Sequence, residues 1–107
     1  MAECLLVTTT VDSREIAERL ADALVERRLA ACAQVGGPVA SSYRWRGAVH
    51  HASEWLCQFK TTRARLSAVE AALETLHPYD LPELTVVPLG GSTAYLAWIA
   101  EAVSEQG

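Results

Sequence analysis

The chain has 107 residues, half of them hydrophobic and 21% charged, with a formal net charge of -4. This length predicts a single domain that spans residues 1–107, and the apolar content is sufficient for a hydrophobic core, which excludes a disordered chain. The basic residues are dispersed among acids, which excludes nucleic acid as an expected partner because a phosphate backbone needs a basic face.

The three cysteines are Cys4, Cys32 and Cys57, and no two of them form a Cys-x-x-Cys pair. An odd, widely spaced set indicates neither a zinc knuckle nor a complete disulfide framework, so we expect three reduced thiols that are buried or half-buried, with Cys57 in the core and Cys4, near the start of the chain, the one that could be exposed. The start of the chain lacks the features of a signal peptide, and no segment has the roughly twenty apolar residues of a membrane span. We therefore expect a soluble, cytoplasmic protein without a membrane partner.

The first elements expected along the chain are a strand and a helix. Residues 5–10 predict the strand, because apolar residues are followed by β-branched ones. Residues 12–15, with the sequence DSRE, have the arrangement of a capping box at the start of a helix. Apolar residues then recur every four positions, which predicts an amphipathic helix that continues to about Arg28.

A long hairpin is expected next, with strands at residues 39–46 and 49–61 and a turn at Gly47. The Gly-Gly-Pro interruption at residues 36–38 suggests a bulge or kink in its first strand. The two strands are longer than a small sheet needs. We infer that their ends pair with, or cross over, a neighbouring subunit.

The last part of the chain predicts a helix, a strand and a final helix. Thr62 can cap the second helix, which must end at His77 because Pro78 disfavours helical geometry in the residue before it. A strand at residues 84–89 and a helix capped by Ser92 follow. The resulting order, β-α-β-β-α-β with an extra C-terminal helix, is the α+β ferredoxin-like pattern of a four-stranded antiparallel sheet with two helices on one face.

Seven short motifs occur in order between about residues 5 and 100, and with them the chain resembles the CutA family of divalent-cation tolerance proteins. The motifs are TTxD at 9–12, LAAC at 29–32, SYRWxG at 42–47, Glu54, KT at 60–61, HPYxxPE at 77–83 and YLxWI at 95–99. The resemblance implies a ferredoxin-like domain that assembles as a tight trimer, with the long hairpin strands building the inter-subunit sheets. It also implies a link to copper and other divalent cations, and a similarity in shape to the PII signalling proteins.

The resemblance implies a copper site made by a cysteine in the first strand and two adjacent histidines before Pro-Tyr. This chain has Thr8 and Leu76 at two of those positions and keeps His77. The candidate ligands for Cu²⁺ or another divalent cation are therefore His77 and, second to it, Cys32, although one histidine needs further ligands to hold Cu²⁺. The alternatives are a buried, inert Cys32 and a structural His77 that is protonated by the helix dipole and hydrogen-bonded to a carboxylate.

A second candidate site is a ligand cleft. Glu54 and Lys60 share strand parity and therefore one face of the sheet. The resemblance suggests that this face borders an inter-subunit cleft near the HPYDLPE loop, where Tyr79 and Glu83 would join them. An acid, a base and a phenol would then converge around a small ligand. The alternative is an inter-subunit salt bridge that sets the register of the trimer.

Other polar and aromatic residues are expected to have structural roles. His50 and His51 are adjacent on a strand and point to opposite faces, so we expect solvated residues at the hairpin tip rather than a metal pair. A larger set of aromatic residues is expected in the core or at an interface: Tyr43, Trp45, Tyr95 and Trp98.

No nucleophile elbow, phosphate-binding loop or HExxH motif occurs, so we expect no enzyme activity. The leading hypothesis is a homotrimer that binds divalent metal in a tolerance or response role. The second is a PII-like regulatory module that binds a small ligand or a partner protein in the inter-subunit clefts. The third is an unrecognised enzyme, which would need a pocket containing a strongly perturbed acid or base.

Overall fold

Four antiparallel strands form one sheet in the order β2-β3-β1-β4 in the computed structural model, which describes residues 2–105. The elements in chain order are β1 (Cys4–Val11), α1 (Arg14–Glu26), β2 (Cys32–Trp45), β3 (Ala48–Thr62), a 3-10 turn (Arg63–Arg65), α2 (Leu66–Leu76), β4 (Thr85–Pro88) and α3 (Thr93–Ala102). This is the predicted ferredoxin-like order with an additional C-terminal helix, and the fold prediction is confirmed.

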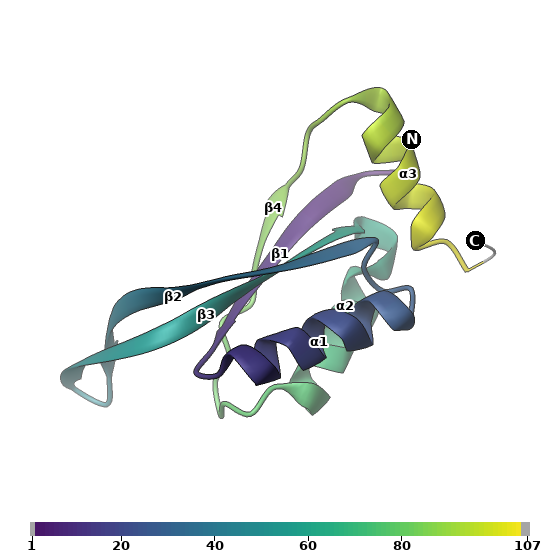
Figure 1. Ribbon diagram of the computed structural model, residues 1–107. Helices are drawn as coiled ribbons and strands as arrows, with labels where there is room; N and C mark the ends of the chain where they lie inside the picture. Colours follow the sequence, from purple (N-terminus) through teal and green to yellow (C-terminus); the bar gives the residue numbers. More distant parts are fainter. Residues whose placement is uncertain (1, 106–107) are drawn as a thin grey trace.

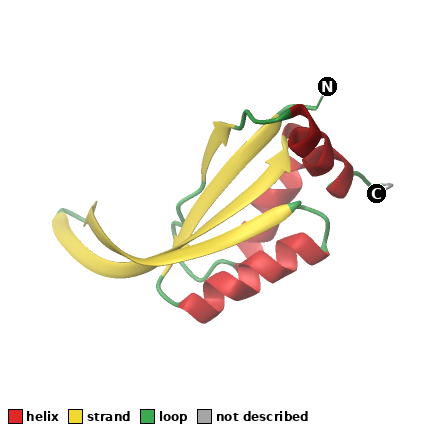
Figure 2. Cartoon of the chain, turned by 45° about the horizontal axis from the view of Figure 1, so that its top comes forward, coloured by secondary structure: helices red, strands yellow, loops and turns green. Residues whose placement is uncertain are grey.

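The core lies between the sheet and two of the helices. Helices α1 and α2 lie side by side on one face of the sheet, whereas α3 lies apart, near the beginning of β1 (Figures 1 and 2). Alternate residues of β1 and β3 point into this core, including the fully buried Val7, Cys57 and Phe59. No helix in residues 2–105 is both long and apolar enough to cross a membrane.

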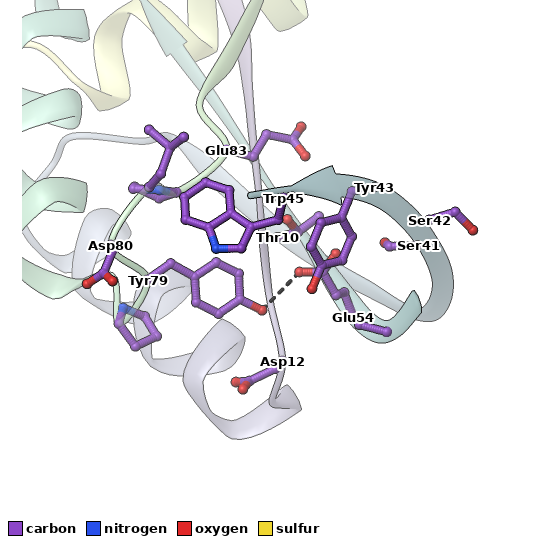
Figure 3. A pocket seen from close by; sticks show the side chains of 14 residues that line it. Thr10, Asp12, Ser41, Ser42, Tyr43, Trp45, Glu54, Tyr79, Asp80 and Glu83 are labelled. Atoms are coloured by element: carbon purple, nitrogen blue, oxygen red, sulfur yellow. Dashed lines mark hydrogen bonds between the residues drawn. The ribbon is translucent and has the colours of Figure 1, made fainter. Parts of the chain in front are cut away.

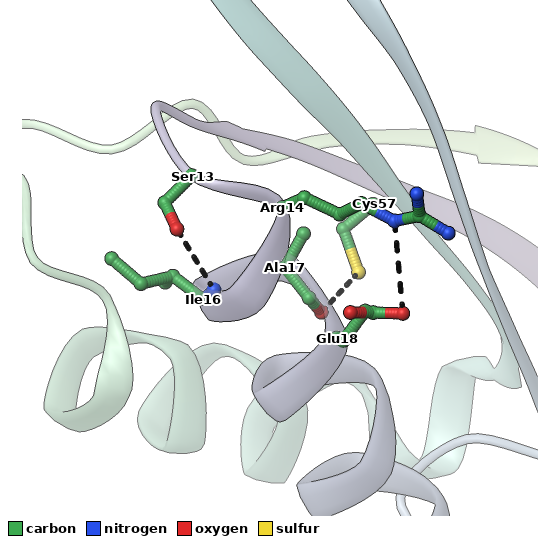
Figure 4. Close-up of polar contacts among 6 residues, drawn as sticks. All are labelled: Ser13, Arg14, Ile16, Ala17, Glu18 and Cys57. Atoms are coloured by element: carbon green, nitrogen blue, oxygen red, sulfur yellow. Dashed lines mark hydrogen bonds and ion pairs between the residues drawn. The ribbon is translucent and has the colours of Figure 1, made fainter.

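Helix α1 begins and ends with identifiable caps. The backbone N–H of Ile16 donates to the Ser13 hydroxyl at 3.4 Å (Figure 4), so Ser13 is the N-cap. A capping box would need a glutamate or glutamine three residues after the N-cap, where this chain has Ile16, so the predicted capping box is not made. The helix ends at Glu26, two residues earlier than predicted. Arg28 adopts a left-handed φ of 59°, and the N–H groups of Arg28 and Leu29 donate back to carbonyls of the last helical turn, as in a Schellman motif.

The thiols occupy different environments. Cys57 is buried, its Sγ lies 3.6 Å from the Ala17 carbonyl (Figure 4), and burial raises the pKa of its thiol to about 12. The core position predicted for Cys57 is therefore confirmed. Cys4, which could have been exposed from its place near the start of the chain, is also buried, because α3 packs over it and places the Leu96 carbonyl 3.7 Å from its Sγ.

The second half of the chain has shorter elements than predicted. Thr62 makes no side-chain cap, and a 3-10 turn separates it from α2. Helix α2 does end before His77, whose backbone is extended, as Pro78 requires. Strand β4 is confined to Thr85–Pro88, and the Ser92 hydroxyl caps α3 as predicted, accepting from the Tyr95 N–H at 3.2 Å.

The long hairpin is confirmed, and its outer half leaves the sheet. Residues 55–62 of β3 pair with β1, whereas residues 48–54 pair only with β2. We call this two-stranded part, residues 39–54, the arm; it projects away from the helices (Figure 1). The predicted bulge lies between Gly36 and Val39, and positive φ at both Arg46 (50°) and Gly47 (80°) makes the tip a two-residue turn of the type that suits twisted hairpins.

Candidate functional site

An open cavity of about 820 Å³ lies between the arm and the loop that follows α2. Its walls come from three segments that are far apart in the sequence: the end of β1, the arm, and residues 78–83 (Figure 3). The loop is held close to β1 because His77 bonds to the carbonyl of Thr10. Residues 78–83 of the HPYDLPE segment therefore form one wall of this cavity.

The centre of the cavity wall is a hydrogen bond between Tyr79 and Glu54. The Tyr79 hydroxyl donates to Glu54 Oε2 at 2.9 Å (Figure 3), and only 8% of Glu54 is exposed. Burial and the neighbouring carboxylates of Glu54 and Asp12 raise the pKa of the Tyr79 phenol well above its usual range. Tyr79 therefore stays protonated and acts as a donor that fixes the Glu54 carboxylate.

His77 supports this wall with both of its ring nitrogens. Its Nε2 lies 2.9 Å from the Thr10 carbonyl, and its Nδ1 accepts the backbone N–H of Tyr79 at 3.1 Å. Because a carbonyl can only accept and an N–H can only donate, the imidazole is neutral with its proton on Nε2. Burial lowers the pKa of His77, and this outweighs the Thr10 carbonyl and the charges of Glu54 and Asp12, which raise it. The predicted protonated histidine with a carboxylate partner is therefore wrong.

The predicted metal ligands do not come together in the chain. A metal ion could reach His77 only by displacing one of its two backbone partners. Cys32 is half-buried and lies opposite Lys60 of β3, whereas Thr10, to which His77 bonds, lies opposite Leu56 of the same strand. Lys60 and Leu56 are four residues apart, which is about 13 Å at the usual strand rise. Residues 2–105 contain no group of three or more His, Cys, Asp or Glu side chains placed to hold a metal ion.

The structure brings together three of the four residues that were predicted for a ligand cleft. Glu54, Tyr79 and Glu83 line the same cavity, and Glu83 also accepts from the Thr85 hydroxyl at 3.1 Å. Lys60 lies on the same face as Glu54, but six residues along the strand, about 20 Å away. Its Nζ instead lies 3.3 Å from the Tyr95 hydroxyl on α3, so the base is absent from this cavity.

Among the lining residues that were not predicted are two acids and two aromatic residues: Asp12, Asp80, Tyr43 and Trp45. Tyr43 and Trp45 were expected in a core or interface, but within the chain they are 45% and 38% exposed and face the cavity from the arm. Their two-residue spacing, which puts both rings on one side of the strand, was the available signal. Asp12 at the end of β1 and Asp80 between two prolines carried no comparable signal.

The two histidines of the arm point to different partners. Both are exposed; His50 stacks on its cross-strand partner Tyr43 with ring centroids 5.6 Å apart, whereas His51 Nδ1 lies 3.0 Å from the hydroxyl of its own partner Ser42. They are surface residues of the arm, as predicted, and do not form a pair of ligands.

Comparisons with known proteins agree with this arrangement over nearly the whole chain. The family model described as CutA1 divalent ion tolerance protein matches residues 5–102. The divalent-cation tolerance protein CutA of Thermus thermophilus is 40% identical over 102 residues, covering 94% of this chain and 97% of that protein. The solved structure of CutA from Synechococcus elongatus, also 40% identical, covers 97% of this chain and 93% of that one with a TM-score of 0.90. A second structure of that protein, complexed with a Bis-Tris molecule, has 39% identity, 95% coverage of both chains and a TM-score of 0.86. The chain therefore belongs to the CutA1 family of divalent ion tolerance proteins.

Proposed function

We propose that this protein acts in divalent-cation tolerance as a cytoplasmic homotrimer that binds a divalent cation, Cu²⁺ among them, and catalyses no reaction. The names of its relatives support the link to divalent cations. Tyr79 in the cavity has a strongly raised pKa, which is the kind of perturbed group that the enzyme hypothesis requires. The direction of that shift disfavours a catalytic role for the phenol itself, because it makes the phenol a weaker proton donor and leaves it protonated at neutral pH, where it is not a base.

The observation that carries the proposal of assembly is the arm. Among the described strands, its two strands pair only with each other, and it exposes large apolar side chains, including Val49 at 56%. An isolated two-stranded ribbon is marginal in water, and exposed apolar groups on a strand favour pairing with another chain. Copies of the chain that pack against one another's arms would cover these groups.

Metal binding in this proposal also depends on assembly. The described part of one chain has no preformed group of three ligands, so a site for Cu²⁺ has to be completed by a second copy. If His77 contributes, it does so at the expense of a backbone hydrogen bond, which keeps the affinity low.

Light scattering and calorimetry test both parts of the proposal. We expect a mass three times that of the 11.6 kDa chain, and Cu²⁺ binding by the assembled protein in a background with His50 and His51 replaced by Gln. Comparison with a His77→Gln variant in the same background separates a site at His77 from one elsewhere. A monomer, or an assembly that binds no divalent cation, would refute the proposal.

A second candidate function is a PII-like regulatory module that binds a small organic ligand. The cavity between the arm and residues 78–83 favours it, because it has the size of a ligand pocket and contains a fixed, buried Tyr79–Glu54 pair. The Synechococcus relative, solved as a complex with Bis-Tris, supports small-molecule binding in this family of structures. A rise in the melting temperature on adding an organic ligand in the presence of EDTA would distinguish this module from a metal binder.

A further inference from the structure

We infer that the cavity binds an organic cation, a compound with a protonated amine, whose nitrogen lies against Glu54 and between the aromatic rings of the wall. This inference rests on the second candidate function, because it names the class of ligand that such a module would bind. It requires no metal ion, and it requires that the assembled protein leaves the cavity between the arm and residues 78–83 open.

The charges that line the cavity all have the same sign. Asp12, Glu54, Asp80 and Glu83 line it, and no lysine or arginine does so among the described residues. An anionic ligand such as a nucleotide phosphate would meet uncompensated carboxylates, whereas a cation would be attracted. The single base predicted for this site, Lys60, is bound to Tyr95 elsewhere.

Glu54 is a largely buried carboxylate of the cavity wall and has no counter-charge among the described residues. It is more than nine-tenths buried and borders the cavity, and its one side-chain hydrogen bond among the described residues is the one that Oε2 accepts from the neutral Tyr79 hydroxyl. No Lys, Arg or His of residues 2–105 comes within ion-pair distance of it. A largely buried carboxylate without a counter-charge is costly, and an ammonium group that donates to Oε1 would supply the charge together with a charge-assisted hydrogen bond.

The aromatic side chains give the cavity a second way to hold a cation. The rings of Tyr43, Trp45 and Tyr79 come from the arm and the loop and line the same cavity as the Glu54 carboxylate (Figure 3). Aromatic faces attract ammonium and guanidinium groups, most strongly for tryptophan. Trp45 already does so: the guanidinium of Arg46, which does not line the cavity, lies 5.5 Å from its ring centroid.

A bare metal ion fits this cavity less well than an organic cation. The four carboxylates are not gathered into a group of ligands, so an ion of small radius could not contact several of them at once. An extended amine can place one nitrogen on Glu54 and a second near the exposed carboxylates Asp80 and Glu83, with its carbon chain along the aromatic rings.

Calorimetry with two probes of equal length tests the inference. The probes are 1,4-diaminobutane and its neutral counterpart 1,4-butanediol, both in EDTA-containing buffer of low ionic strength. We expect binding of the diamine but not of the diol. Glu54→Gln, which keeps an acceptor for Tyr79, should weaken diamine binding by about tenfold or more, because a charge-assisted hydrogen bond is lost. Choline is tested in parallel because its quaternary ammonium group has no N–H. Its binding therefore measures the attraction of a cation by the aromatic rings without a hydrogen bond from that cation's nitrogen to Glu54.

Glu70→Gln is the matched control, since Glu70 is an exposed acid on α2 outside the cavity and its replacement changes the net charge by the same amount. We expect the control to bind diamine like the unmodified protein, and Trp45→Leu to bind it about threefold to fivefold more weakly. Equal binding of diamine and diol, equal affinity of the Glu54→Gln and Glu70→Gln variants, or tighter binding of ATP than of the diamine would overturn the inference. Binding of ATP in the cavity would overturn the inference of an organic cation but would leave the regulatory-module proposal standing. Light scattering on the same samples tests the trimer separately.

Discussion

The two halves of strand β3 differ both in sequence pattern and in surroundings. From Trp55 to Thr62 the strand lies between β1 and β2 under α1 and α2, and its alternate residues form the core. From Ala48 to Ser53 the residues are AVHHAS, without that alternation; among the described elements only β2 pairs with them, and they are exposed or half-buried. The half with an alternating pattern therefore carries the core of the domain, and the half without it presents a surface.

The largest expected difference between the halves comes from the core. Phe59→Ala should lower the free energy of unfolding by about 3–5 kcal/mol, because a fully buried aromatic is removed between the sheet and the helices. Urea unfolding followed by circular dichroism measures the loss. A loss below about 1 kcal/mol would mean that the body of the sheet tolerates a cavity, and the contrast with the arm would disappear.

The next largest effect should occur where the loop meets β1. His77→Ala should cost about 1–3 kcal/mol, because the Thr10 carbonyl and the Tyr79 N–H would lose their partner. His77→Gln is the informative comparison, since its amide can donate to one of these groups or accept from the other. If both variants were as stable as the unmodified protein, His77 would not be what attaches the loop to β1.

The same histidine gives a pH dependence whose sign follows from its lowered pKa. The folded state holds His77 neutral, so the unfolded chain binds more protons, and stability is present above the unfolded value of about 6.5 and is lost as the pH falls below it. The difference in melting temperature between the unmodified protein and His77→Gln should therefore shrink between pH 8 and pH 5.5. A difference that grows on acidification would show that His77 is protonated in the folded protein.

An effect of similar size is expected at the bulge where the arm leaves the body. Gly37 has φ of 138°, and a β-carbon there would lie 3.0 Å from the Glu54 carbonyl oxygen, so Gly37→Ala should cost about 1–3 kcal/mol. The neighbouring Gly36→Ala is the matched control, because a β-carbon at Gly36 meets nothing within 4 Å. Thermal unfolding of the two variants compares them, and equal melting temperatures would contradict the constraint at Gly37.

The smallest effect within one chain is expected in the arm. Val49→Ser should change the stability of the isolated chain by less than about 0.5 kcal/mol, because Val49 is exposed. If copies cover the arm as proposed, the variant should instead weaken association, which light scattering and melting at two protein concentrations would detect. Val25→Ser, at a similarly exposed valine on α1, serves as the control. A large loss that is independent of concentration would contradict both the exposure and the association.

Much of the fold could be predicted because its signals are local. Period-two and period-four patterns located the long hairpin and α1, Pro78 ended α2, and Ser92 capped α3. The end predicted for α1 and the exposure considered for Cys4 differ from the structure because of contacts that the local pattern does not specify. Arg28 ended α1 earlier through backbone hydrogen bonds, and the packing of α3 buried Cys4 near the start of the chain.

The sequence by itself determined the order of the elements, the bulge, the turn at the hairpin tip and the importance of the HPYDLPE loop, because each depends on backbone geometry that glycine, proline and apolar spacing control. Only the tertiary structure decided which charged groups meet. It joined Tyr79 to Glu54, left Lys60 six residues along β3 from Glu54, and satisfied both nitrogens of His77 with backbone groups. Side-chain partners depend on contacts between segments far apart in the chain, and the charge and protonation of the cavity follow from those contacts.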